Sequence, residues 1–150
     1  MKTLGKVAGI IGLLIVIAFA GSIGKIIGKS TVKNYEQGKA DAAIEEILME
    51  TTKKINSQLP IMVDQETRLD TTICYGKQMH YKYTMVNCAE NELDKEAFQN
   101  EMATMLVKNQ CNNENMVKML KMGITYYYNY FDKDGILIAT IKISKKNCGL

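Results

Sequence analysis

The sequence has few of the residues on which common catalytic and nucleic-acid sites depend. Its 150 residues include no Trp, one Arg and one His. Catalysis needs a nucleophile, a base or a metal in an arranged site, and a single His offers little material for one. The sequence has no cluster of basic residues of the kind that binds nucleic acid, so a nucleic-acid-binding protein is disfavoured. We therefore expect a non-enzymatic protein without a cofactor, a metal or a nucleic-acid partner.

Cysteine is absent before Cys74, which excludes lipid attachment of the lipoprotein type near the N-terminus. The later cysteines form no C-x-x-C motif, so a thioredoxin-like motif and the usual zinc knuckles are also absent. Four cysteines suit two disulfides in an oxidising compartment, and four reduced thiols in a cytosolic domain are the alternative. Because Cys111 lies at a predicted helix and Cys148 in the last residues, we expect a Cys111–Cys148 bond, which leaves Cys74 with Cys88.

Two groups of residues could form chemical sites, but a structural role explains each of them. Cys74, His80 and Cys88 are close enough in sequence for a Cys–His pair or a metal site, but His80 falls on the predicted wet face of a strand. Asp132–Gly135 resembles the start of a calcium loop, but Ile136 follows where further oxygen ligands are needed. A hairpin turn explains the same residues.

The first 29 residues predict a membrane anchor. The run Val7–Gly24 holds eighteen residues without a charge, close to the roughly 20 residues that cross a bilayer core as a helix. In lipid only a helix or a closed barrel satisfies the backbone polar groups, and one segment cannot close a barrel. We predict a transmembrane signal anchor at 1–29, a juxtamembrane connector at 30–40 and a soluble domain at 41–150.

A cleaved signal peptide is the alternative, because Ala18-Phe19-Ala20 fits the A-x-A pattern before a cut after Ala20. Hydrophobic residues resume at Ile23, which favours the retained anchor. Lysines flank the run on both sides, so the positive-inside rule does not orient the chain. The cysteines favour a single-pass inner-membrane protein whose C-terminal domain is periplasmic or extracytoplasmic.

Small residues recur at four-residue spacing in the predicted anchor, ending with Gly24 and Gly28. Such a face permits close approach of another helix, so Gly24 and Gly28 are candidate contacts for self-association or for docking onto a membrane protein. Glycine is also common in membrane helices without any such role, which is the alternative.

The soluble part alternates between helix and strand periodicity. Apolar residues from Ile44 to Leu59 recur at three and four residues and predict an amphipathic helix that Pro60 ends. Two more helices are predicted in the middle, one capped by Asp94 and one over Asn113–Met122. We therefore expect about three helices after the anchor.

Two stretches with a period of two predict β-hairpins: Thr67–Val86 and Ile124–Ile143. The second contains an Asp-Gly turn between β-rich runs, a strong hairpin signal. The order of elements after the anchor is α-β-β-α-α-β-β. We predict an α+β fold in which a four-stranded antiparallel sheet carries the helices on one face.

The second predicted hairpin has tyrosines on both faces of one strand. If Tyr127 and Phe131 are inside, then Tyr126, Tyr128 and Tyr130 form a row on the open side of the sheet. Tyrosine is enriched at protein interfaces because it combines a large apolar body with a polar tip. These three tyrosines are candidate interface residues, and cross-strand packing on a solvated sheet is the alternative.

The stretches Lys53–Thr72 and Gly123–Ile143 resemble parts of small membrane-anchored proteins found in many bacteria, which also carry a short apolar N-terminus and late cysteines. No activity is established for that group, so the resemblance assigns no functional residues. It implies a bacterial envelope protein.

These features predict a protein that acts by binding. We expect an accessory or scaffolding subunit of an envelope assembly that meets the lipid bilayer and recognises a protein partner or a second copy of itself. The alternative is an extracytoplasmic ligand-binding or sensor module, for example for envelope glycans, which predicts a concave apolar pocket with converging polar groups.

Overall fold

The computed structural model describes residues 37–150. The elements in chain order are α2 (Gln37–Asn56), β1 (Ile61–Met62), β2 (Thr67–Tyr75), β3 (Gln78–Met85), the 3-10 turn η1 (Glu90–Glu92), α3 (Lys95–Cys111), α4 (Glu114–Lys121), β4 (Thr125–Phe131), β5 (Leu137–Ile143) and the 3-10 turn η2 (Lys145–Cys148). The predicted anchor, most of the connector, Gly24 and Gly28 lie outside the described residues. Among residues 37–150, no helix is long and apolar enough to cross a membrane.

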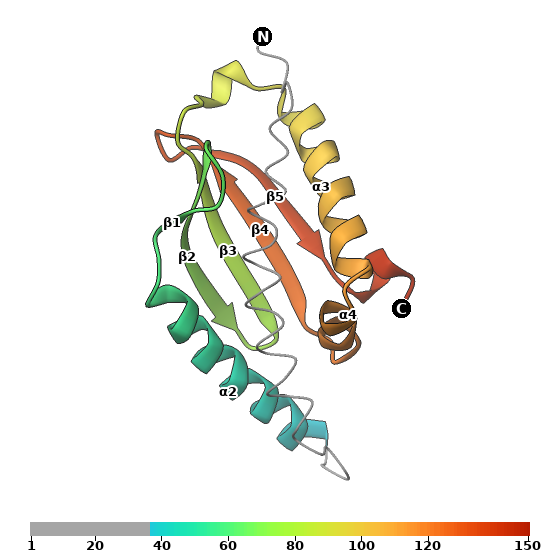
Figure 1. Cartoon of the computed structure of the whole chain (residues 1–150). Coiled ribbons are helices and arrows are strands. Elements are labelled where there is room, and N and C mark those ends of the chain that lie inside the picture. Colours follow the sequence, from blue (N-terminus) through green and yellow to red (C-terminus); the bar gives the residue numbers. More distant parts are fainter. Residues whose placement is uncertain (1–36) are drawn as a thin grey trace.

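The strands form one five-stranded sheet with the order β1-β2-β3-β4-β5 (Figure 1). The two hairpins β2–β3 and β4–β5 are antiparallel, but β3 and β4 pair in parallel. The predicted α+β class is confirmed, whereas the predicted four-stranded antiparallel sheet is wrong. Helices α3 and α4 carry the chain back along the sheet before β4 begins, which is the crossover that parallel pairing needs. The additional strand β1 has two residues, too few to show a period.

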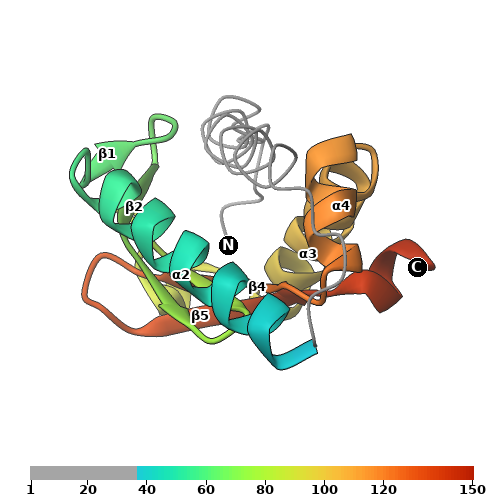
Figure 2. The same cartoon turned by 90° about the horizontal axis from the view of Figure 1, so that it is seen from below.

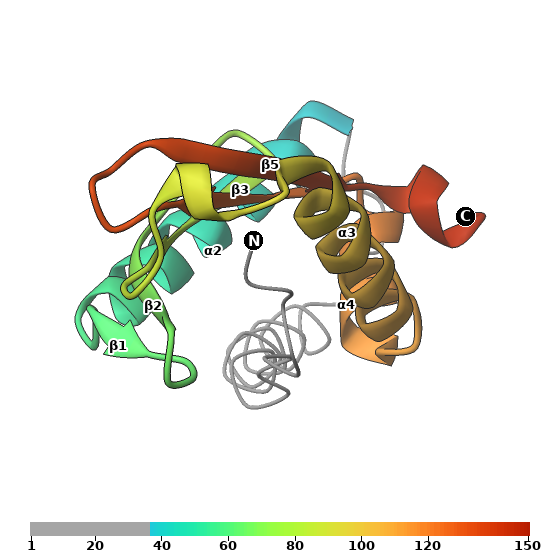
Figure 3. The ribbon, with the colours of Figure 1, turned by 90° about the horizontal axis from the view of Figure 1, so that it is seen from above.

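All three described helices lie on one face of the sheet (Figures 2 and 3). Helix α2 packs against β2, and α3 packs against β5. The predicted helical pattern of α2 is confirmed, because Ile44, Leu48, Thr51 and Ile55 are all buried. The opposite face, which none of these helices covers, is called the open face below.

Asn56, the last residue of α2, attaches the helix to the sheet. Its Nδ2 donates to the carbonyl oxygen of Thr72 at 2.8 Å, and its Oδ1 accepts from the Thr72 backbone N–H at 2.8 Å and from the Thr72 hydroxyl at 3.0 Å. Beyond the short β1, this side of β2 has no neighbouring strand in the described sheet. The amide of Asn56 therefore satisfies an edge that would otherwise present unpaired backbone groups.

Side chains cap both α3 and α4, and the cap of α3 is the predicted Asp94. Asp94 accepts from the backbone N–H of Ala97 at 3.0 Å, and Asn113 accepts from the N–H of Met116 at 3.0 Å. Gly123 follows α4 with a φ of +88°, a backbone conformation that residues with a Cβ rarely adopt. These stops fix the sharp turn that sends the chain from α4 into β4.

Cys111 at the end of α3 and Cys148 in η2 form a disulfide, with their Cα atoms 5.3 Å apart. The expected Cys74–Cys88 bond is not formed, and Cys74 is a thiol. Cys74 pairs with Met79 beside the β2–β3 turn, whereas Cys88 follows β3 at the other end of the hairpin. At about 3.3 Å per strand residue, the two are separated by roughly 20 Å, so the hairpin itself prevents the bond.

Asp132 is 1% exposed and organises the β4–β5 turn. Its Oδ1 accepts from the N–H of Asp134 at 2.9 Å and of Ile136 at 2.7 Å, and its Oδ2 accepts from the N–H of Glu90 at 2.9 Å. Burial alone would raise the pKa of this carboxyl, but the backbone hydrogen bonds together hold its pKa below the usual value. The residue thus shapes the turn and joins it to η1.

Replacing Asn56 by Ala should destabilise the domain by about 1–3 kcal/mol, because it leaves the buried N–H and carbonyl of Thr72 without partners. Chemical denaturation of both proteins measures the difference. Ser57→Ala is the matched control, since the exposed Ser57 hydroxyl donates to the carbonyl of Lys54, three residues earlier. Equal losses in the two variants would contradict the role of Asn56.

Asp132→Asn should lower Tm by roughly 5 °C or more at neutral pH, because an amide cannot accept on both sides. A carboxyl with a lowered folded pKa stabilises above its unfolded pKa of about 3.9, and this stabilisation is lost as the pH falls through the folded pKa. The Tm difference should therefore shrink below about pH 4. Thermal melts across pH check this, with the exposed Asp134→Asn as control; a difference that persists in acid would refute it.

Candidate functional site

Tyr126, Tyr128 and Tyr130 face the helices and are 0%, 1% and 4% exposed. The prediction that they form a row on the open side is therefore wrong. The pairing of Tyr126 with Ile143 and Tyr128 with Ile141 places these tyrosines on the same face as the buried isoleucines. Tyr127 and Phe131, which were expected inside, lie half-buried on the open face instead.

The buried tyrosines form a layer across the two central strands. Tyr81 stacks on Tyr128 with ring centroids 5.2 Å apart, and Tyr83 stacks on Tyr130 at 5.1 Å. Burial raises the pKa of the Tyr128 hydroxyl well above its ordinary value, with smaller contributions from neighbouring tyrosines, so it stays neutral. That hydroxyl accepts from Nε2 of Gln110 on α3. This layer is core and holds the helices to the sheet.

The open face carries a different set of side chains, aligned across four strands. Ile73 on β2 lies opposite His80 on β3, His80 lies beside Tyr127 on β4, and Tyr127 lies opposite Lys142 on β5. We call these four residues the open-face row. The side chains alternate along each strand, so one register places the tyrosine layer inside and this row outside.

His80 is held between two aromatic rings. Its ring stacks on Tyr127 with centroids 4.4 Å apart and an interplanar angle of 2°, and Tyr75 approaches its edge at 5.8 Å. Partial burial lowers the pKa of His80 from its ordinary value of 6.5, so the imidazole is neutral at pH 7. The structure gives His80 aromatic neighbours and no thiolate partner among the described contacts, in keeping with a packing role.

Lysines lie over the aromatic rings of this face. The Nζ of Lys142 is 5.6 Å from the centroid of Tyr127, and the Nζ of Lys82 is 5.0 Å from the centroid of Phe131. Cations in these positions are attracted to the ring face. Positively charged ammonium groups therefore lie beside these aromatic rings, which remain partly accessible at the surface.

A shallow hollow of about 210 Å³ opens within this surface, lined by residues that include Ile73, Tyr75, His80, Lys82 and Phe131. Ile73 is 45% exposed and Tyr75 is 65% exposed. Such contiguous apolar surface, bordered by polar groups, is typical of interaction sites. The sequence predicted an aromatic surface on the open side of the sheet but assigned it to the wrong tyrosines.

The described residues offer little for metal or nucleophilic chemistry. Within 37–150, no group of three or more His, Cys, Asp and Glu side chains could hold a metal ion. The Asp132–Gly135 turn uses its buried carboxylate on backbone N–H groups. The arrangement of the open face suits non-covalent binding.

Comparison with solved structures identifies similar folds at low sequence identity. EpsS, a pilotin of the type 2 secretion system of Vibrio vulnificus, is 15% identical with a TM-score of 0.62, over 74% of this chain and 96% of its own. AspS, the type II secretion system pilotin of Vibrio cholerae, is 17% identical with a TM-score of 0.55, over 74% of this chain and 97% of its own. The chain shares the fold of these two proteins.

A candidate secreted protein of Pseudomonas aeruginosa shares the same architecture, with 16% identity, a TM-score of 0.61, and coverage of 73% of this chain and 96% of its own. No protein-family model matches the sequence, and no curated protein is significantly similar to it. The similarity to these proteins therefore rests on the arrangement of helices and strands.

The single histidine makes the open face directly measurable by NMR, because His80 gives the only imidazole signals. Its pKa should lie below 6.5, and Tyr127→Ala should raise it toward 6.5 by exposing one face of the ring to water. A proton titration of the His80 signals checks both values. Ile136→Ala, an exposed change in the β4–β5 turn, is the control and should leave the pKa unchanged. A normal pKa in the unaltered protein would contradict the partial burial of the His80 ring.

Proposed function

We propose that this chain is a non-enzymatic accessory protein of a bacterial envelope assembly, and that it binds a protein partner through the open face of its sheet. The observation that carries the proposal is the exposed aromatic and lysine surface on a pilotin fold. The proteins that share this fold include pilotins of type II secretion systems, and we carry an accessory role of that kind over to this chain.

The open face is suited to a protein partner. Interfaces are enriched in aromatic residues that combine apolar area with a polar tip, and Tyr75 and Tyr127 supply these here. The stacking of His80 on Tyr127 orders the side chains before any partner arrives, which reduces the entropy lost on binding. Lys82 and Lys142 flank the apolar centre and favour a partner whose contact surface has acidic groups at its margin.

The membrane anchor predicted for residues 1–29 completes the proposal. A retained anchor would hold the domain at the inner membrane, with the connector spacing it from the bilayer. The Cys111–Cys148 bond fits a periplasmic or extracytoplasmic location, because disulfides persist mainly in oxidising compartments. Self-association through the anchor or the open face would make the partner a second copy of the chain.

Glycan binding is the second candidate, and the hollow beside His80 is the observation that favours it. Sugars stack on aromatic side chains, and Tyr75 is exposed next to this hollow. A ligand pocket also needs converging polar groups for specificity, and Lys82 and Asn129 are the nearest candidates in its lining. A flat protein contact uses more of the row than a small sugar would.

The partner hypothesis predicts site-specific crosslinking. A photo-crosslinking amino acid in place of Tyr75 should capture one defined polypeptide in intact cells. The same amino acid in place of Met49, which is similarly exposed on α2, should not. Adding Ile73→Asp should weaken capture by about tenfold or more, because it buries an unpaired charge in the contact.

Mass spectrometry of the crosslinked band distinguishes the outcomes. A band with twice the mass of the chain assigns the face to self-association. Equal capture from Tyr75 and Met49, or capture that Ile73→Asp does not weaken, would reject the open face as the binding surface.

A further inference from the structure

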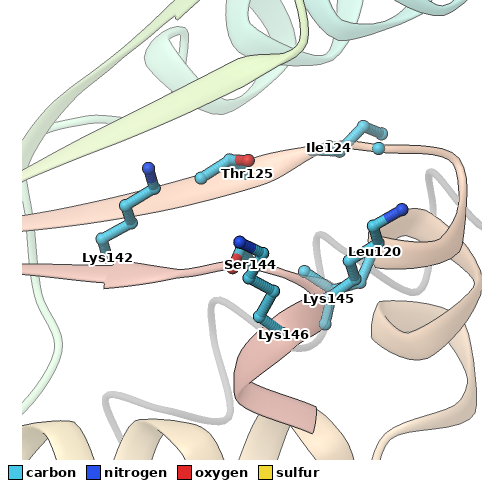
Figure 4. Close-up of a pocket in the computed structure, with 8 residues that line it drawn as sticks. Leu120, Ile124, Thr125, Lys142, Ser144, Lys145 and Lys146 are labelled. Atoms are coloured by element: carbon cyan, nitrogen blue, oxygen red, sulfur yellow. The ribbon is translucent and has the colours of Figure 1, made fainter. Parts of the chain in front are cut away.

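A second hollow, of about 250 Å³, lies where β4 begins and β5 ends (Figure 4). Lys142, Lys145 and Lys146 line it together with the hydroxyl-bearing Thr125 and Ser144. Figure 4 shows Thr125 and Lys142 on adjacent strands and Ser144 where β5 runs into η2. None of the described residues that line it carries a carboxylate.

The charge of this hollow differs from that of the rest of the described domain. Residues 37–150 contain 14 Lys and Arg against 15 Asp and Glu, so their net charge is slightly negative. The hollow nevertheless brings three lysines together, and no carboxylate of the described residues forms an ion pair with them. Like charges that gather without compensation favour an anionic ligand at the site.

We propose that this lysine pocket binds the phosphate group of an anionic phospholipid headgroup at the membrane surface. Ammonium groups donate strong hydrogen bonds to phosphate oxygens, and the Thr125 hydroxyl is a further donor in the lining. The Ser144 hydroxyl already donates to Oδ1 of Asn147 at 3.0 Å. Leu120 and Ile124 also line the hollow but are only 0% and 1% exposed, so the exposed lysines supply its main accessible groups.

The pocket lies at the end of the domain where α2 begins. The Oδ1 of Asp41, near the start of α2, pairs with the Nζ of Lys77 at 2.8 Å. The carbonyl of Lys77 accepts from the backbone N–H of Thr125 at 2.9 Å, and Thr125 lines the pocket. Two contacts therefore connect the first turns of α2 with Thr125 in the lining of the pocket, and Figure 1 shows the start of α2 and the end of the chain toward the same end of the sheet.

The inference rests on the membrane anchor that is part of the proposed function. Twelve residues separate Gly24, the end of the uncharged run, from Gln37, the start of α2. Even fully extended, they span at most about 40 Å. An anchored chain therefore keeps this end of the domain near the headgroups, where tethering makes a weak contact effective.

The test uses the full chain in lipid nanodiscs and measures how fast each lysine is acylated. One preparation contains only phosphatidylcholine, and the other also contains phosphatidylglycerol. We expect phosphatidylglycerol to slow acylation of Lys142, Lys145 and Lys146 by about fivefold. Lys53 and Lys108, which are exposed on α2 and α3, are internal controls and should react at the same rate in both.

Lys118 and Lys121 of the neighbouring helix α4 are further controls. They distinguish binding in the pocket from a general shielding of this side of the domain by the membrane. Protection that is equally strong at these two lysines would overturn the proposal. Equal acylation rates in the two lipids would also overturn it. If inorganic phosphate protected the lysines in the phosphatidylcholine preparation and phosphatidylglycerol did not, the pocket would be a site for free phosphate and the proposal would be wrong.

Paired variants make the test independent of folding. The exposed change Lys145→Gln with Lys146→Gln should abolish the lipid-dependent protection of Lys142, whereas Lys53→Gln with Lys54→Gln should preserve it. A chain that fails to remain with the nanodiscs refutes the anchor, and therefore the proposed membrane location. A nanodisc-bound chain without specific protection refutes the lysine pocket alone.

Discussion

The parallel pairing of β3 with β4 is the constraint on which both faces of the protein depend. It places Tyr81 beside Tyr128 on the helix side, with ring centroids 5.2 Å apart, and His80 beside Tyr127 on the open side, at 4.4 Å. A slip of one residue would exchange the two faces of a strand. Phenol rings would then enter water, and a histidine would enter the core. The same register therefore decides what holds the domain together and what it presents.

The sequence predicts the elements of this fold more successfully than their arrangement. Periodicity and capping residues locate α2, α3, α4 and both hairpins, because these signals are local. The parallel contact between the hairpins joins segments that are distant in the chain, and nothing near β3 or β4 encodes it. The contact of Asn56 with Thr72 cannot be predicted for the same reason. Only the folded sheet shows that the outer side of β2 has free backbone groups at Thr72.

Of the two errors about the site, the sequence contains the remedy for one. The loop between β4 and β5 comprises the five residues 132–136, and Phe131 pairs with Leu137. A register shift between Tyr130 and Phe131 then pairs Tyr126 with Ile143 and Tyr128 with Ile141, so the identity of the buried tyrosines depends on an irregularity that the sequence pattern does not reveal. By contrast, the predicted first hairpin already separates Cys74 from Cys88 by most of a strand. The open-face row differs, because it needs the parallel register that only the fold supplies.

Lys142 belongs to both surfaces of this domain. Its ammonium lies 5.6 Å from the ring of Tyr127 in the open-face row, and its side chain lines the lysine pocket. A headgroup that draws the ammonium away from Tyr127 would uncover that ring, and a partner that covers the ring would restrict the lysine. Since any effect of one ligand on the other is reciprocal, the direction of coupling depends on whether the two ligands prefer the same lysine position. The shared side chain would therefore couple the proposed contact with the membrane to the proposed recognition of a partner.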